Sequence, residues 1–238
     1  MPAVLAQTNY CSANLCKKGK HIACNNKGNF ASICKNPKLI KITPNLRNRI
    51  VNKHNTLRNK IAKGFGKFPK AQRMATMVWN NELAKIAEYN VKQCQMRHDK
   101  CRNTKNFSHS GQNIAISTWS GKQMNVGQVV NTHIQNWFKE YKNCPLSAIK
   151  SYKNPKNGKA IGHFTAMVQD KSTDVGCAIL RHRKNGSMQQ IMTCNYAYTN
   201  MKKSPVYRQG PTASKCKTGK DKKFKSLCST REKYNLKK

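Results

Sequence analysis

The chain has 238 residues, with 46 Lys and Arg against 8 Asp and Glu, so its formal charge is 46 − 8 = +38. A hydrophobic content of 37% still supports one buried core, so disorder throughout the chain is excluded. The few carboxylates exclude calcium cages of the EF-hand kind, and no run of about 18 apolar residues is present that could span a membrane.

The first predicted helix follows an irregular N-terminal part. Residues 7–44 are rich in Cys, Asn, Gly and Lys without sustained periodicity, which indicates a loop-rich segment. Thr43 and Pro44 then offer a helix start, and apolar residues recur at spacings of three and four. This stripe consists of Leu46, Ile50, His54, Leu57 and Ile61.

Three further elements are predicted in the middle of the chain. A second helix begins near Asn80, a strand covers residues 112–118, and a third helix runs over 126–141. The stretch 143–159 contains two prolines and a glycine, and its composition predicts a long polar loop.

A hairpin and a basic extension complete the chain. Residues 175–181 and 188–196 flank Asn185-Gly186, a dipeptide typical of a tight β-hairpin turn. From residue 202 to 238 the chain is basic and irregular, and Cys216 and Cys228 are spaced to close one small loop.

The cysteines indicate the compartment. There are 11 cysteines, none in a CxxC pair, which is typical of a disulfide framework and therefore of a secreted protein. Residues 1–6 look like the end of a signal peptide behind an added Met1, and we leave them out of the fold. Glycosylation sequons at Asn106 and Asn185 are compatible with secretion.

Five short motifs follow one another along the chain. They are residues 54–58 (HNTLR), 77–84 (MVWNNELA), 111–115 (GQNIA), 162–168 (GHFTAMV) and 193–196 (TCNY). Together they resemble the CAP superfamily of antigen 5, cysteine-rich secretory and plant pathogenesis-related proteins. The spacing of the first four cysteines is most similar to insect antigen 5 proteins, and the tail after Pro205 resembles fly salivary members.

The resemblance implies an α+β fold, an α-β-α sandwich with a three-stranded antiparallel sheet between helical layers, over a core of residues 45–201. It also implies four disulfides: Cys11–Cys24, Cys16–Cys101, Cys34–Cys94 and Cys177–Cys194. Proximity in sequence predicts a fifth, Cys216–Cys228. Cys144 then remains unpaired, either as a buried thiol, as an exposed thiol that links two chains into a homodimer, or as a modified thiol.

The family's central cleft carries two histidines and two acids, which the resemblance assigns to His54, His163, Glu82 and the position of Gln112. Two imidazoles and one carboxylate are the ligand set of an open Zn²⁺ site. Gln112 is a neutral amide and cannot serve as a general base, so chemistry that needs two carboxylates is unavailable. We expect a structural polar network, with weak Zn²⁺ binding and hydrolysis as the alternatives.

Two kinds of binding site are further candidates. Val130, Ile134, Trp137 and Phe138 on the third predicted helix could line an apolar channel for fatty acids or eicosanoids, although such stripes usually form core. Residues 1–81 contain 16 Lys and Arg and no acid, which favours a surface for polyanions such as heparan sulfate, polyphosphate, anionic lipid or the nucleic acid backbone. Its predicted members are Lys60, Lys63, Lys67, Lys70 and Arg73.

These observations predict a secreted, non-enzymatic antigen 5-like protein of saliva or venom, an allergen by resemblance, that modulates host haemostasis or immunity by binding. No cofactor is required in this reading. The alternatives are a scavenger of small apolar ligands, a protein that binds immunoglobulin or complement, and a weak metal-dependent hydrolase.

Overall fold

The computed structural model describes residues 8–16, 20–155 and 158–236. Its centre is a mixed sheet in the order β1-β4-β5-β3, with β2 parallel to β4 beside this path. The strands are β1 (Lys35–Leu39), β2 (Val78–Trp79), β3 (Gly111–Trp119), β4 (Asp174–Lys184) and β5 (Ser187–Tyr196). The predicted signal-peptide remnant, residues 1–6, lies outside the described residues.

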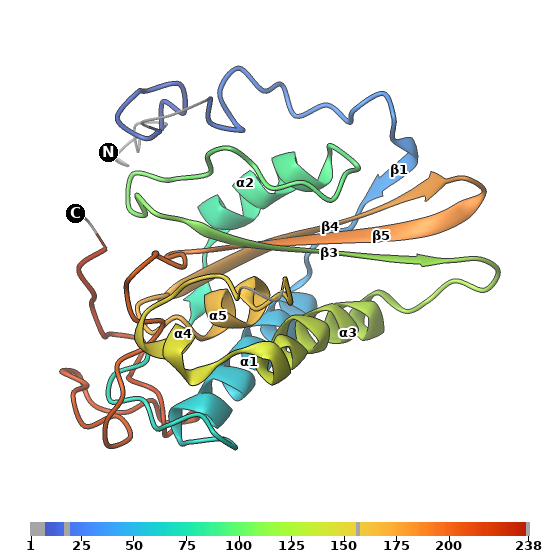
Figure 1. Cartoon of the computed structure of the whole chain (residues 1–238). Helices are drawn as coiled ribbons and strands as arrows, with labels where there is room; N and C mark the ends of the chain where they lie inside the picture. Colours follow the sequence, from blue (N-terminus) through green and yellow to red (C-terminus); the bar gives the residue numbers. More distant parts are fainter. Residues whose placement is uncertain (1–7, 17–19, 156–157, 237–238) are drawn as a thin grey trace.

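Helices cover both faces of the sheet (Figure 1). One face carries α2 (Asn81–Val91), and the other carries α1 (Pro44–Ala62), α3 (Val126–Lys139) and α5 (Gly162–Val168). A 3₁₀ turn over Glu140–Asn143 and the short α4 (Leu146–Lys150) follow α3. This confirms the predicted α-β-α sandwich. Among the described residues, no helix is long and apolar enough to cross a membrane.

Local sequence accounts for the main elements. Thr43, Asn80 and Asn125 each accept a hydrogen bond from a backbone N–H in the first turn of the helix that follows, so all three long helices begin at a polar cap. Asn185 and Gly186 adopt positive φ at the turn between β4 and β5, as the predicted hairpin requires.

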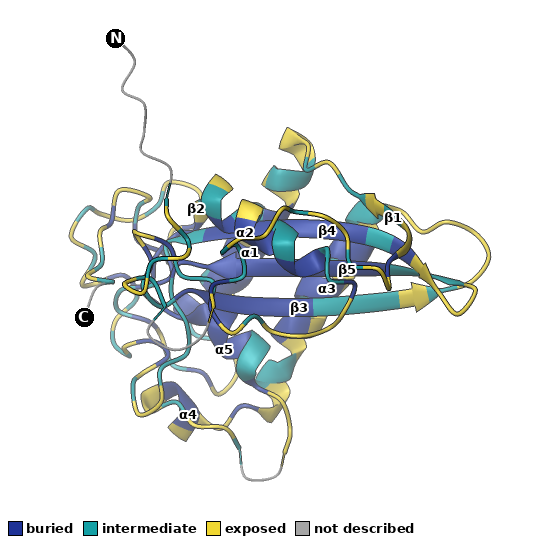
Figure 2. Cartoon of the chain, turned by 90° about the horizontal axis from the view of Figure 1, so that it is seen from above, coloured by how far each residue is buried: buried dark blue, intermediate teal, exposed yellow. Residues whose placement is uncertain are grey.

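The larger core fills the space between the sheet and α1, α3 and α5, and a smaller one lies under α2. Close packing of α2 depends on Gly176 of β4, where an added Cβ would lie 2.2 Å from the backbone nitrogen of Ala84. The buried centres of the strands and their more exposed ends near the β4–β5 turn are visible in Figure 2.

Five disulfides join the described residues, in the five pairs that the sequence analysis predicts. The elements that sequence periodicity missed are short. β1 and β2 widen the expected three-stranded sheet, α4 interrupts the predicted polar loop, and α5 has no amphipathic pattern because most of its side chains are buried.

The C-terminal extension is bound to the core along its length. Residues 209–215 run beside residues 70–72, with hydrogen bonds from the backbone N–H of Gly210 to Lys70 O and of Lys215 to Gln72 O. Farther along, the N–H of Ser226 donates to Asn59 Oδ1 of α1. Figure 1 shows this extension beside the end of α1 and the loop after it.

Candidate functional site

A cavity of about 580 Å³ opens beside the start of β3 and the start of α5. The residues that line it include His98, Gln112 and His163, together with Tyr152 and Asn200. We call this cavity the central cleft. It is the part of the described structure in which two histidines share one opening.

Each cleft histidine is held through Nδ1. His98 Nδ1 lies 2.8 Å from Gln112 Oε1, and His163 Nδ1 lies 2.6 Å from Glu140 Oε1. The other oxygen of Glu140 accepts the backbone N–H groups of His163 and Phe164 at the start of α5. Partial burial, with a further contribution from the positive charge of Arg102, lowers the pKa of His98, so this imidazole is neutral at neutral pH.

Gln112 lies in the cleft, as predicted, but its amide is fully used. Its Nε2 donates to Asp99 Oδ2 at 2.6 Å and to Asn195 Oδ1 at 3.0 Å. Asp99 is itself paired with Arg102 and accepts a hydrogen bond from Asn90. The carboxylates near the two histidines therefore hold protein groups in place, and two free carboxylates for acid–base chemistry are not brought together among these residues.

Two of the predicted cleft residues lie elsewhere, so this part of the prediction is wrong. His54 is fully buried in the core, with Nδ1 2.9 Å from Ile50 O and Nε2 3.0 Å from the Tyr196 hydroxyl. Burial lowers the pKa of His54 to about 4, so it is a neutral core residue. Glu82 lies on the first turn of α2, where it accepts a 2.8 Å hydrogen bond from the Tyr10 hydroxyl.

His98 and Glu140 take the places that the sequence analysis gives to His54 and Glu82. Glu140 directly follows α3 and is one of only 8 acids, which is the signal that could have pointed to it. His98 lies in a polar segment without periodicity, between Cys94 and Cys101, and no sequence pattern distinguishes it from the other histidines of the chain.

The donor set does not complete a metal centre. Among the described residues, no group of three His, Cys, Asp or Glu side chains is placed to hold a metal ion. His98 and His163 would supply two ligands, whereas catalytic zinc sites usually take three from the protein. Gln112 does not supply the third, because its Oε1 is already in contact with Nδ1 of His98. The predicted set of His54, His163 and Glu82 is not assembled.

The predicted apolar channel on α3 is also wrong. Val130, Ile134, Trp137 and Phe138 are at most 3% exposed and belong to the larger core. The indole nitrogen of Trp137 donates to Ile114 O at 3.2 Å, which fixes the ring against β3. These side chains fill the space that a ligand would need.

Cys144 is a free, buried cysteine, which is the first of the three states that the sequence leaves open for it. Cys144 is 0% exposed, and burial raises its pKa to about 12. A sulfur inside the core is out of reach of a second chain, so the alternative of a homodimer linked through Cys144 does not apply to the folded protein. It is the inert, buried thiol of the sequence analysis.

Four of the five residues of the predicted polyanion surface are exposed, and their binding of polyanions stays a prediction. Lys60, Lys63, Lys67 and Lys70 are exposed around the end of α1 and the turn after it. Arg73 is not a free cation, because its Nε lies 2.6 Å from Glu232 Oε1 and its guanidinium stacks over the Tyr234 ring.

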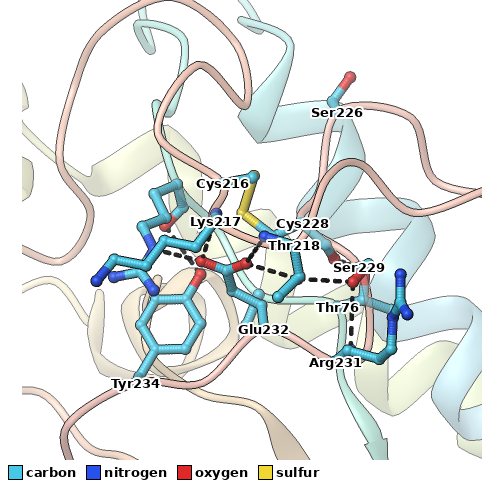
Figure 3. Close-up of a disulfide and its surroundings, with 12 residues drawn as sticks. Thr76, Cys216, Lys217, Thr218, Ser226, Cys228, Ser229, Arg231, Glu232 and Tyr234 are labelled. Carbon is cyan, nitrogen blue, oxygen red and sulfur yellow. Dashed lines mark hydrogen bonds and ion pairs between the residues drawn. A yellow bond between two sulfur atoms is a disulfide. The ribbon is translucent and has the colours of Figure 1, made fainter.

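The sequence analysis missed the part of this surface that the extension supplies. The Cys216–Cys228 disulfide closes a loop beside the same end of α1. Figure 3 shows this disulfide together with Glu232, which holds the loop. Glu232 accepts the backbone N–H groups of Lys217 and Thr218, so the loop is fixed at its base. This part of the extension contains six exposed lysines: Lys215, Lys217, Lys220, Lys222, Lys223 and Lys225. We call these six, with Lys60, Lys63, Lys67 and Lys70, the basic end.

Comparison with known proteins places these features in context. The model of the cysteine-rich secretory protein family (CAP) matches residues 51–196. Venom allergen-1 of Aedes aegypti is 42% identical over 226 residues, which cover 94% of this chain and 89% of that protein. Antigen 5 like allergen Cul n 1 of Culicoides nubeculosus is 44% identical and covers 75% and 85%. The solved structure of NaASP2 with Zn²⁺ is similar at a TM-score of 0.64 and 27% identity, over 79% of this chain and 96% of that one.

Proposed function

The chain belongs to the cysteine-rich secretory protein (CAP) family, and within it we propose that this protein acts by binding sulfated polysaccharide through its basic end. Like its venom allergen relatives, the protein is secreted and extracellular. We further propose that it performs no catalysis and that this binding serves to modulate host haemostasis or immunity. The observation that carries the proposal is the basic end itself, where lysines from two distant parts of the chain meet on one surface.

Contacts between the two parts support a single surface. The side chain of Lys223 reaches Asn52 Oδ1 of α1 at 3.1 Å, and the Thr212 hydroxyl donates to Ala62 O at the end of the same helix. The lysines of the extension and those after α1 therefore cannot separate without breaking these contacts. Charges in such an arrangement sum their fields over one patch, which attracts a long anion more strongly than scattered charges do.

The acids of the extension do not cancel this charge. Residues 202–238 contain 13 Lys and Arg and only Asp221 and Glu232 as acids. Asp221 Oδ1 accepts the backbone N–H groups of Lys223 and Phe224, and Glu232 is buried against Arg73. Both carboxylates thus stabilise the loop and leave the lysines to an external anion.

Rigidity favours binding as well. The Cys216–Cys228 disulfide and the hydrogen bonds to Glu232 restrict the loop before any ligand arrives. A preorganised cation array loses less conformational entropy on binding than a free tail, which otherwise costs about 0.5–1.5 kcal/mol for each ordered side chain.

The aromatic rings near these lysines favour a sulfated polymer over nucleic acid. The ammonium group of Lys60 lies 4.0 Å from the Phe65 ring centre, and that of Lys223 lies 5.4 Å from the Phe224 ring centre. Phe224 is 9% exposed and Phe68 is 3% exposed. The bases of single-stranded nucleic acids stack on open aromatic faces, whereas the rings of Phe68 and Phe224 are buried.

The test compares heparin with single-stranded DNA and polyphosphate at equal ionic strength by calorimetry. We expect heparin to bind most tightly and the variant with Lys220, Lys222, Lys223 and Lys225 changed to Gln to lose at least tenfold in affinity. The matched control changes four exposed lysines elsewhere, Lys27, Lys38, Lys41 and Lys122, to Gln. DNA binding at least as tight as heparin binding, or equal losses in both variants, would contradict the proposal.

The other candidate functions have less support from the site. A hydrolase would need two free carboxylates or a complete metal centre in the cleft. An apolar scavenger using α3 would need the space that Trp137 and its neighbours fill. Weak Zn²⁺ binding by His98 and His163 is kept as a subsidiary proposal, because both imidazoles line one cavity.

A further inference from the structure

A second cavity, of about 880 Å³, lies on the α2 face of the sheet near the β4–β5 turn. α2 ends at Val91, while β4 and β5 continue beyond it toward Asn185 (Figure 1). Residues 32–35 and 94–96, which the Cys34–Cys94 disulfide joins, form the opposite wall. We call this cavity the distal pocket.

The mouth of the distal pocket is apolar. Met96 is 59% exposed and Ile33 is 48% exposed, which makes them the two most exposed large apolar side chains of the described chain. Ile116 of β3 continues the apolar wall. Exposed apolar side chains that gather beside polar ones commonly mark an interaction site.

The floor contains a histidine without hydrogen bonds. His182 is 1% exposed, and neither ring nitrogen has a hydrogen-bond partner among the described residues. The backbone of Arg183 and the side chain of the cross-strand neighbour Gln189 lie close enough to raise the pKa of His182, but neither reaches hydrogen-bond geometry with the ring. The Nε2 of Gln189 donates instead to Thr118 Oγ1 at 3.0 Å. Burial lowers the pKa of His182, so the neutral ring offers one donor and one acceptor.

Such a group is costly for the folded protein. A buried polar group without a partner loses its bonds to water and gains none in return. A partner that completes the hydrogen bonds of His182 would remove this cost.

The rim of the pocket is cationic. Lys35, Arg183 and Lys184 line it, and the register between β1 and β4 sets Lys35 opposite Arg183. The lining residues include no acidic side chain. The occupant is therefore expected to carry a negative charge next to an apolar group.

We propose that the distal pocket binds an extended acidic segment of a partner protein, with an apolar side chain beside Met96 and Ile33 and a carboxylate at Lys35 and Arg183. One peptide unit supplies both an N–H and a C=O, which matches the acceptor and the donor of His182. Small-molecule sites bury most of their ligand, whereas these walls are half exposed and suit a segment that continues into a larger body.

The test selects peptides from a random displayed library on the full-length protein in about 0.5 M sodium chloride, where charges are screened beyond about 4 Å. This salt weakens charge contacts at both sites, but the apolar contacts with Met96 and Ile33 remain, so the outcome at the distal pocket is separate from the heparin proposal. We expect the selected peptides to combine Glu or Asp with a neighbouring large apolar residue.

Synthetic versions of these peptides are then titrated against two matched variants. Met96→Glu places a repelling charge in the pocket, and Met124→Glu makes the same change at a methionine that is also exposed, at 43%, but lies outside it. We expect Met96→Glu to lose at least tenfold in affinity and Met124→Glu to lose less than twofold. His182→Phe is expected to weaken binding about tenfold while raising the melting temperature.

Three results would overturn the proposal. The first is that selection yields no peptide above background, and the second is that the selected peptides bind Met96→Glu and Met124→Glu equally. The third is that laurate binds the parent and loses affinity for Met96→Glu, whereas no selected peptide responds to this substitution. That result would assign the pocket to small amphipathic anions instead of a protein segment.

Discussion

In the central cleft, the carboxylates of Glu140 and Asp99 accept hydrogen bonds from the side chains of His163 and Gln112 and hold them in place. At the basic end, Asp221 and Glu232 instead accept hydrogen bonds from backbone N–H groups and, among the described residues, form no ion pair with the lysines. The polar side chains of the cleft therefore form most of their hydrogen bonds with one another. The basic end carries charge that the chain cannot neutralise, because 46 cations face 8 acids. The difference indicates that external binding energy is available at the basic end more than in the cleft.

The largest effect is expected when the loop of the basic end is released. Changing Cys216 and Cys228 together to Ser should lower the free energy of unfolding by about 3 kcal/mol, the usual cost of opening a loop of this length. Heparin affinity should fall about tenfold because the lysines lose their fixed positions. Denaturant unfolding and calorimetry measure both effects.

The control for this prediction is Cys144→Ala, which removes the buried free thiol and leaves the five disulfides intact. It should leave heparin affinity within twofold of the parent. If the disulfide variant bound heparin as tightly as the parent, preorganisation of the loop would have no role.

A smaller effect is expected at the base of the loop. Burial opposes ionisation of Glu232, but hydrogen bonds from Lys217, Thr218 and Arg73 lower its pKa overall. A carboxyl group whose pKa is lowered by folding stabilises the protein above its unfolded pKa, near 4.5, and this contribution is lost as the pH falls through the folded value. Glu232→Gln should therefore cost about 1–3 kcal/mol at pH 7 and progressively less in acid.

Unfolding of the parent and Glu232→Gln proteins across pH 3 to 7 measures this difference. Glu88→Gln serves as the comparison, because Glu88 pairs with Lys85 and Lys92 on the surface of α2. It should cost less than about 1 kcal/mol. A pH-independent cost of Glu232→Gln would show that its charge does not fix the loop.

The smallest effect is expected in the cleft. Chelator-stripped protein should show weak Zn²⁺ binding by calorimetry, and His98→Ala or His163→Ala should each abolish the heat, because two imidazoles leave no spare protein ligand. His54→Gln should retain it, since His54 is bonded to Ile50 and Tyr196 inside the core. Retention of zinc binding by His163→Ala would exclude the cleft as the site.

The sequence predicts those elements whose pattern is local. The stripe from Leu46 to Ile61 predicts α1, and Asn185-Gly186 predicts the turn between β4 and β5. By contrast, β2 has only two residues, and it exists because Val78 and Trp79 pair with Asp174 and Val175 far along the chain. Two residues are too few to show a periodic pattern, so sequence periodicity cannot detect a strand that forms only by pairing with a distant segment.

The site follows the same rule. Gln112 and His163 were found from their motifs, whereas His54 lies in the apolar stripe of α1, a position that itself indicates the core. His98 reaches the cleft only because the fold brings the loop after α2 against β3, as its hydrogen bond to Gln112 shows. The lysines of the extension join those after α1 through backbone contacts that no spacing in the sequence specifies.

The central claim is tested most directly by the salt dependence of heparin binding to three proteins: the parent, the variant with Lys220, Lys222, Lys223 and Lys225 changed to Gln, and His163→Ala. For a single-stranded polyanion, each lost contact reduces the slope of log affinity against log salt by about 0.7. The account predicts a slope smaller by roughly 3 for the lysine variant and an unchanged slope for His163→Ala. Equal slopes for the parent and the lysine variant would contradict it.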